Sequence, residues 1–340
     1  MNTPLYTTMI LIISEPLEQS TSDVTEWLQF LGKEYIRINF GDRIEIRDIY
    51  FKENMPVIVF SVNNSTLIST DIITSYWYRR GALSLKHMNK FLYTIKTKAL
   101  QMQLSDNIAS EINTVKELLY FVLESKNNTL GSFYTKENNK LIHLHMAGKL
   151  GIAVPETIIC TDKEKLQQFY KKFPTGIIIK AAGNSFSFVR RQTRGNDKIF
   201  GVYTNQVTTE QITCFPKHFP PTLLQEKVEK EFELRIFYLK GQFYTMAIFS
   251  QGDEKTKMDF RRYNKEKQNY RVPFIIPGGL KRKLKKFMSE AGLSTGSIDM
   301  IYTRKKEFVF LEVNPVGQFG MVSYPCNYKL EKKIALALSN

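Results

Sequence analysis

Apolar runs at the start of the chain predict an α/β unit. Residues Met9 to Ser14 form a short apolar run typical of a buried strand, and Tyr35 to Phe40 form a second one. Between them, apolar residues recur at the spacing of one helix face, at Val24, Trp27, Leu28 and Leu31. Further strands are predicted at Pro56 to Ser61 and Ser75 to Tyr78. A strand, helix and strand in this order favour a parallel sheet with helices on its faces.

The middle of the chain predicts two helices with a linker between them. The pattern is helical from Leu85 to Lys126, and the polar stretch 127 to 137 is interpreted as a linker. A second helix is predicted from Lys140 to Leu150, because Gly151 follows it and glycine commonly follows a helix C-terminus. After one more strand, Thr161 to Glu164 has the pattern of a helix capping box.

A strand at Gly176 to Lys180 carries a lysine to its end. Such a lysine is a suitable point charge for a phosphate, although many lysines at strand ends simply extend to water. Residues 181 to 185 follow as a turn that suits the covering of a phosphate. Arg190, Arg191 and Arg194 then predict a basic hairpin that contacts either phosphate or an acidic substrate.

The last third predicts two β-hairpins. Strands at Arg235 to Tyr238 and Gln242 to Phe249 meet across Lys240 and Gly241. Strands at Ser297 to Thr303 and Glu307 to Val313 meet across a basic turn. Because side chains alternate across a strand, we expect one face to hold Phe308, Phe310, Glu312 and Asn314.

The second of these hairpins carries a candidate metal site. Glu312 and Asn314 point the same way at the strand end, and Asp299 on the partner strand supplies a third oxygen ligand. A carboxylate in an otherwise apolar strand is costly unless it is paired, and oxygen ligands suit a hard cation such as Mg²⁺. The alternative is that the acid faces solvent and that Asn314-Pro315 only ends the strand.

Composition and charge narrow the class of protein. Hydrophobic residues make up 43% and charged residues 24% of the 340 positions, as in globular proteins of two or three domains. No apolar run approaches a membrane span, and three widely spaced cysteines fit reduced thiols, so we expect a cytoplasmic protein without membrane association. The net charge of +15 indicates an anionic partner, yet no nucleic-acid-binding motif is present.

Several motifs, taken in order, resemble the ATP-grasp ligases. The stretch from Asn139 to Ile159, the segment TLLQEKV from Thr222, and a strand ending Leu-Glu-Val-Asn-Pro are similar to segments that bind ATP and magnesium in that family. One branch is resembled more closely: the peptide maturases of the microviridin or graspetide type, above all their grasp-with-spasm members. That likeness rests on Tyr76 to Arg80, Asp259 to Arg261, Arg271 to Phe274, and Gly317 to Gly320 with Ser323-Tyr324-Pro325.

The resemblance implies a mixed α/β and α+β architecture, an ATP-grasp fold with an N-terminal α/β domain. The implied domains are an N-terminal α/β domain at 1–126, a central lid at 127–223, and a C-terminal domain with the magnesium and ATP site at 224–340. ATP is expected between the last two.

The resemblance also implies roles for individual residues. Lys140 and Lys180 are expected at the ATP phosphates, Glu233 at the ribose, and the backbone of Gln225, Glu226, Lys227 and Val228 at the adenine. The metal ligands are Asp299, Glu312 and Asn314. The expected catalytic residues are Arg235, Lys180 and, as a candidate base, Asp259. The expected substrate-binding residues are Arg235, Arg261, Arg190 and Arg194.

The implied reaction uses ATP and Mg²⁺ to activate Asp or Glu side chains of a ribosomally made precursor peptide as acyl phosphates. A Ser or Thr hydroxyl then forms a macrocyclic ω-ester, and a lysine amine forms an amide instead. The expected partner is a precursor with a leader and an acidic, Thr/Ser-rich core, and a homodimer is left open. Two alternatives remain, an ATP-grasp ligase for a free amino acid and a basic nucleic-acid-binding protein.

Overall fold

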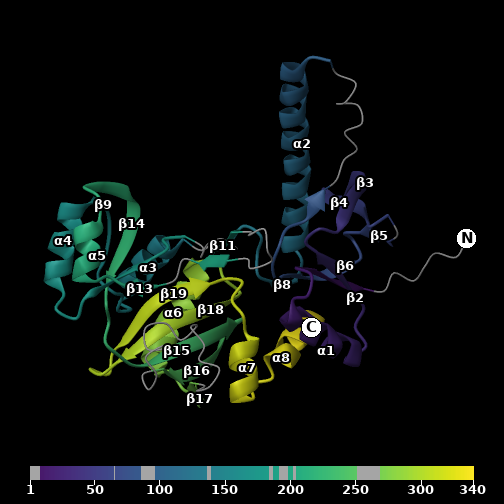
Figure 1. The fold of residues 1–340 in the computed structure, drawn as a ribbon. Helices are drawn as coiled ribbons and strands as arrows, with labels where there is room; N and C mark the ends of the chain where they lie inside the picture. Colours follow the sequence, from purple (N-terminus) through teal and green to yellow (C-terminus); the bar gives the residue numbers. More distant parts are fainter. Residues whose placement is uncertain are drawn as a thin grey trace, which may run out of the picture. The chain divides into compact units, whose positions relative to one another are not determined.

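The computed structural model describes residues 8–64, 66–85, 96–135, 139–183, 187–190, 198–201, 204–250 and 269–340, with the backbone alone at 66, 187–190 and 198–201. Contacts divide the chain into two compact units (Figure 1). Unit 1 comprises Met1–Lys136 and Lys329–Asn340, and unit 2 comprises Glu137–Tyr328. This division differs from the boundaries expected from the sequence, because helix α8 (Leu330–Ser339) lies in unit 1 rather than with 224–340.

The main sheet of unit 1 is parallel, in the order β2-β1-β6-β8. Its strands are β1 (Met9–Ser14), β2 (Tyr35–Asn39), β6 (Ile73–Tyr78) and β8 (Asn128–Leu130). The apolar run of β1 is central and buried, as expected for a strand covered on both faces. The predicted parallel sheet is therefore confirmed. The expected linker at 127 to 137 is corrected, because β8 pairs with β6.

Helix α1 (Gln19–Phe30) packs against α8 in unit 1. Val24 and Leu28 are fully buried, as their spacing predicts, and Thr21 and Thr25 complete the buried face. Glu18 caps the helix by accepting a hydrogen bond from the Thr21 N–H.

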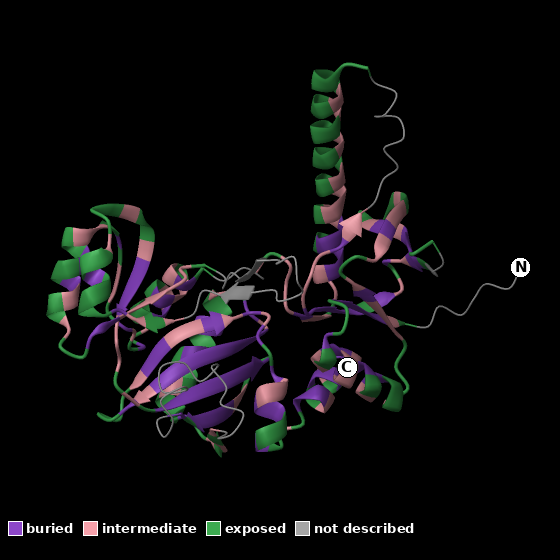
Figure 2. Cartoon of the chain, viewed as in Figure 1, coloured by how far each residue is buried: buried purple, intermediate pink, exposed green. Residues whose placement is uncertain are grey.

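A second sheet of unit 1 has the order β5-β4-β3-β7. Its strands are β3 (Arg43–Lys52), β4 (Met55–Val62), β5 (Thr66–Ser69) and β7 (Ser84–Leu85). Only β4 was predicted; the second half of β3 is mostly exposed and does not alternate between apolar and polar residues. Helix α2 (Lys98–Glu124) is buried only near its C-terminal end (Figure 2). Leu100 and Met102, near its start, are exposed. Residues 86 to 95 of the expected helix lie outside the described residues.

The first part of unit 2 is a sheet of order β13-β10-β14-β9. Its strands are β9 (Thr157–Asp162), β10 (Ile177–Lys180), β13 (Asn205–Gln206) and β14 (His218–Glu226). Helices α4 (Lys163–Lys172) and α5 (Thr209–Cys214) pack on its core. A separate hairpin pairs β11 (Ser187–Arg190) with β12 (Lys198–Gly201). The capping prediction is corrected by one residue, because Asp162 rather than Thr161 caps α4.

The second part of unit 2 is an antiparallel sheet of order β17-β16-β15-β18-β19. Its strands are β15 (Lys230–Leu239), β16 (Gln242–Phe249), β17 (Tyr270–Phe274), β18 (Thr295–Thr303) and β19 (Phe308–Asn314). Helices α3 (Lys140–Lys149) and α6 (Gly278–Glu290) share a core with one face, and α7 (Gly320–Cys326) contacts β15, β16 and β17. Both predicted hairpins are confirmed, with Lys240 and Gly241 at positive φ in the first turn.

No disulfide joins Cys160, Cys214 and Cys326, as their spacing predicts. Within the described ranges, no helix has the length and apolar character needed to span a membrane.

Candidate active site

A β-bulge in β19 decides which side chains face the candidate site. Asp299 of β18 pairs with Glu312, whereas the next residue of β18 pairs with Phe310, so Leu311 is an extra residue in β19. Phe310 and Val313 therefore both enter the core shared with α3 and α6.

Glu312 and Asn314 lie on the opposite face of the sheet, in register with Asp299 and Ser297. The expectation that Phe308 and Phe310 share a face with Glu312 and Asn314 is therefore wrong, because strict alternation does not continue across a bulge. The grouping of Asp299, Glu312 and Asn314 on one face is unaffected by this correction.

Arg235 and Asp299 form a buried ion pair on this face. They are cross-strand neighbours in β15 and β18, and each residue is 8% exposed. Arg235 Nη1 donates to both Asp299 oxygens, each at 2.6 Å. Charge-assisted contacts of this length are strong, so the pair holds both side chains in fixed positions.

Lys140 connects the large sheet with the end of β10. Its Nζ lies 3.2 Å from Glu312 Oε2 and donates to the Ala181 carbonyl oxygen, also at 3.2 Å. Ala181 directly follows Lys180, the last residue of β10. The structure therefore brings together Lys140, the turn after Lys180 and the carboxylate of Glu312.

Asp299 and Glu312 stand directly opposite each other on neighbouring strands. Like charges in that position destabilise a sheet, and here Arg235 and Lys140 offset them. Two carboxylates and the Asn314 amide form an oxygen-donor set suited to Mg²⁺. Asn314 Oδ1 accepts a hydrogen bond from Val316 N–H at 3.1 Å and retains a second lone pair.

No cluster of three His, Cys, Asp or Glu side chains that could hold a metal occurs in the described part of the chain. The candidate site consists instead of two carboxylates with an amide as the third donor. These residues fit Mg²⁺ by the chemistry of their oxygens and by their shared sheet face.

Glu233 lies on the same face of β15 and accepts two hydrogen bonds. Lys230 Nζ lies 2.8 Å from Oε1, and Ser250 Oγ donates to Oε2, also at 2.8 Å. Neither donor was predicted from the sequence. Strict alternation places Lys230 and Glu233 on opposite faces, because residues three apart in a regular strand face opposite sides. A register shift between Lys230 and Phe232 instead places Lys230 beside Glu233.

The segment expected to hold adenine is the end of β14 and the residues after it. The N–H groups of Glu226 and Lys227 donate to the carbonyl oxygens of Glu156 and Gly176. Gln225 is fully buried and donates to Thr157. Among the described residues, the Val228 N–H has no hydrogen-bond partner, so it is one donor in this segment that a ligand can use.

The remaining expected residues fall outside this cluster or outside the described residues. Arg190 is the last residue of β11, where only the backbone is described. Arg194, Asp259 and Arg261 lie outside the described residues.

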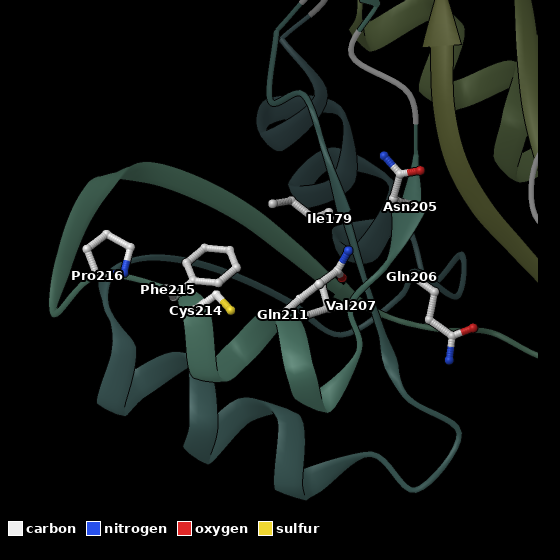
Figure 3. Close-up of a pocket in the computed structure, with 8 residues that line it drawn as sticks. All are labelled: Ile179, Asn205, Gln206, Val207, Gln211, Cys214, Phe215 and Pro216. Atoms are coloured by element: carbon white, nitrogen blue, oxygen red, sulfur yellow. The ribbon is translucent and has the colours of Figure 1, made fainter.

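A cavity of about 530 Å³ lies elsewhere in unit 2, against β10, β13 and α5 (Figure 3). It is lined by Ile179, Asn205, Gln206, Val207, Gln211, Cys214, Phe215 and Pro216. None of the residues expected at the nucleotide or metal lines this cavity.

Comparison with solved structures identifies the architecture. The macrocyclase MdnC of Microcystis aeruginosa MRC, bound to its precursor peptide MdnA, matches with a TM-score of 0.71 and 24% identity over 98% of this chain and 99% of that chain. A RiPP-associated ATP-grasp ligase of Chryseobacterium gregarium, in complex with ADP and a leader and core peptide, matches with a TM-score of 0.72 and 22% identity over 98% and 96%.

A more distant likeness is to the VanG D-Ala:D-Ser ligase of Enterococcus faecalis, with a TM-score of 0.51 and 14% identity over 98% of each chain. No protein-family model and no curated protein matches the sequence. Since the structural likeness extends over nearly the whole of each chain, the protein has the ATP-grasp fold expected from its sequence.

Proposed function

We propose that this protein is an ATP-dependent ligase that joins side chains within a ribosomally made precursor peptide. The observation that carries the proposal is the cluster on one sheet face: Asp299 opposite Glu312, each held by a cation, beside the turn that follows Lys180. Its fold is also that of MdnC and of the Chryseobacterium ligase, both solved with peptides.

In this proposal the nucleotide lies between the end of β14 and the large sheet. Adenine accepts a hydrogen bond from the Val228 N–H, and the carboxylate of Glu233 accepts the ribose hydroxyls. Lys140 and Lys180 neutralise the phosphates. Each residue belongs to unit 2, which carries 13 of the net 15 positive charges of the chain.

Asp299, Glu312 and Asn314 would hold Mg²⁺, which when bound neutralises charge on the transferring phosphoryl group. The protein's own residues bind the nucleotide, orient the reacting groups and neutralise the phosphate charge. Arg235 is placed by Asp299 on the sheet face where the acyl phosphate is expected, and its guanidinium matches the oxygens of a carboxylate or phosphate. No covalent nucleophile from the protein is required, because phosphoryl transfer depends mainly on positioning and charge.

The reaction balances in two steps. A peptide carboxylate oxygen attacks the γ-phosphorus of ATP, which gives an acyl phosphate and ADP. A Ser or Thr hydroxyl then attacks the acyl carbon, phosphate leaves, and the hydroxyl proton is released as an ω-ester forms. A lysine amine gives an amide by the same route. The positive charge of unit 2 favours a substrate rich in Asp and Glu.

The test incubates the protein, ATP and Mg²⁺ with the acidic, Thr/Ser-rich peptide encoded beside its gene and measures peptide mass. Each linkage removes the mass of one water and releases one ADP. The same peptide with its Asp and Glu residues changed to Asn and Gln is the matched control and should keep its mass. Unchanged mass of the acidic peptide, with no release of ADP, contradicts the proposal.

The likeness to the D-Ala:D-Ser ligase favours a second candidate, a ligase for free amino acids. That function predicts release of ADP when the enzyme receives amino acids or dipeptides without the precursor. Release of ADP that requires the precursor peptide excludes it.

A further inference from the structure

Helices α3 and α6 cover the face of the five-stranded sheet that lies opposite the candidate site (Figure 1). Leu284 and Phe287 of α6 enter the core on that face together with Phe310 of β19. Asp299 and Glu312 point to the other face. The sheet therefore separates the outward side of α6 from the candidate site, so side chains on that side of α6 do not contact a nucleotide bound there.

The outward side of α6 is basic. Five of the six residues from 281 to 286 are lysine or arginine, and each of the five is exposed. The sixth, Leu284, is fully buried in the core. This pattern defines the α6 basic face, which consists of Lys281, Arg282, Lys283, Lys285 and Lys286.

Two neighbouring elements add a cation each beside this face. Lys283 Nζ donates to the Gly151 carbonyl oxygen at 2.5 Å, and Gly151 closely follows the exposed Lys149 that ends α3. The turn Lys240-Gly241 lies beside α6, because a Cβ atom on its glycine would lie 3.6 Å from Lys285 Cε. Cations from three elements therefore meet on one surface.

These cations are unfavourable for the fold by itself. Lys281 and Lys285 are like charges one helical turn apart, and so are Arg282 and Lys286. Lys281 also lies in the first turn of α6, where the helix dipole disfavours a cation. Among the described residues, Glu290 is the one carboxylate that pairs with this face, 3.8 Å from Lys286 Nζ. A surface of this kind is stabilised by an anionic partner.

The exposed side chains favour an acidic polypeptide as this partner. A helix that binds a membrane surface inserts large apolar side chains, and α6 exposes none. No nucleic-acid-binding motif is present in the sequence. An acidic peptide needs only carboxylates, which cations spaced by one helical turn can bind in succession. The proposed substrate is a peptide of this kind.

We propose that the α6 basic face binds acidic residues of the precursor peptide that lie outside the segment being joined at the candidate site. This inference rests on the proposed function, which supplies the precursor as the partner. An extended chain gains about 3.3 Å per residue and a helix is about 10 Å thick, so on the order of ten residues pass around the edge of the sheet. One peptide therefore reaches both faces. The contacts strengthen binding of the precursor without acting on the reacting groups.

The experiment compares the double variant Lys281→Glu/Lys285→Glu with the double variant Lys33→Glu/Lys52→Glu. The second pair consists of exposed lysines in unit 1, so both variants change the net charge of the chain by the same amount. Fluorescence anisotropy measures binding of the labelled precursor, and ADP release gives KM and kcat. Calorimetry with ADP and Mg²⁺ checks that the nucleotide site is intact.

We expect the α6 variant to bind the precursor about tenfold more weakly and to raise KM by a similar factor. Its kcat and its affinity for ADP should be unchanged, which a misfolded protein would not show. The unit 1 control should retain the affinity and KM of the unaltered protein. Lys281→Gln/Lys285→Gln, which removes the charges without reversing them, should have a smaller effect in the same direction.

Two outcomes overturn the inference and leave the proposed function intact. Equal precursor affinities in the α6 variant and the control, with normal modification of the peptide, exclude docking at this face. An α6 variant that keeps its affinity for the precursor but loses binding to single-stranded DNA or to phosphatidylserine vesicles shows that the face serves another anion. If the unaltered protein neither binds nor modifies the precursor, the proposed function itself fails.

Discussion

The two units each contain a buried arginine–carboxylate pair, and the pairs differ in what surrounds the carboxylate. In unit 1, Arg79 Nη2 lies 2.9 Å from Glu18 Oε1. Glu18 also accepts hydrogen bonds from the Thr21 N–H and Thr21 hydroxyl, both at 2.7 Å, and from the Ser20 hydroxyl at 3.0 Å. In unit 2, Asp299 faces Arg235 on one side and the carboxylate of Glu312 on the other.

The pair in unit 1 is satisfied by the fold itself. Burial lowers the pKa of Arg79 to about 10, which leaves it charged at neutral pH. Burial also raises the pKa of Glu18, but the charge of Arg79 and the hydrogen bonds of Thr21 and Ser20 outweigh it, so that this pKa lies below its ordinary value. The pair joins the end of β6 to the start of α1.

The pair in unit 2 belongs to a crowded set of charges. Two opposed carboxylates repel each other, and cations are what make their closeness tolerable. Two opposed carboxylates with cations beside them suit the binding of a metal and a phosphate, whereas a fully hydrogen-bonded pair suits a structural joint. Both pairs are buried, so burial alone does not distinguish a structural ion pair from one in a binding site. The groups around the carboxylate distinguish them.

The largest expected effect is on the stability of unit 1. Arg79→Ala leaves the buried Glu18 without its cation and should lower the free energy of unfolding by about 3–5 kcal/mol. Urea unfolding followed by circular dichroism measures this. Arg47→Ala removes an exposed guanidinium from Glu45, which still pairs with Arg43; this control should cost at most about 1 kcal/mol. A loss in Arg79→Ala no larger than in the control contradicts a structural joint.

The next effect is on turnover in unit 2. Glu312→Gln should reduce ATP-dependent linkage formation about 100-fold or more, because it removes a charge that the transferring phosphate site requires. Its stability should change less than that of Arg79→Ala, since one of two opposed carboxylates is lost. The measurements are ADP release and urea unfolding. Normal turnover in Glu312→Gln would show that this residue holds no catalytic metal.

A smaller effect is expected for nucleotide binding. Lys180→Ala should weaken ADP binding about tenfold or more, the size of one lost charge-assisted contact. Calorimetry compares it with Lys172→Ala, an exposed lysine at the end of α4 that pairs with Glu156. Equal affinities in the two variants would assign the phosphate to another cation.

The smallest effect is on the pH dependence of stability. The pKa of Glu18 is lower in the folded than in the unfolded protein. Its contribution to the free energy of unfolding is therefore complete above the unfolded pKa of about 4.3 and is lost as pH falls through the folded pKa. Acid titration of unfolding should show this loss below about pH 4. Glu18→Gln should flatten that part of the curve; an unchanged slope would place the acid sensitivity elsewhere.

Local patterns predicted much of the fold. The apolar run of β1, the stripe of α1 and both hairpins of the large sheet each arise from residues close in sequence, and the structure contains all of them. The bounds differ most at β15, which begins five residues before the predicted Arg235. The shared face of Asp299, Glu312 and Asn314 was also predicted, because each residue stands out chemically in its strand, and the register of β18 and β19 contains it.

The sequence by itself determined the types of elements and the chemistry of the candidate site, whereas tertiary structure decided which side chains meet. The bulges at Leu311 and Glu231 reverse the facing of the residues beyond them, and their positions depend on pairing with β18. Lys230 and Ser250 reach Glu233 only through such pairing. Helix α8 likewise belongs to unit 1 because it packs against α1. This contact joins opposite ends of the sequence, so no local pattern predicts it.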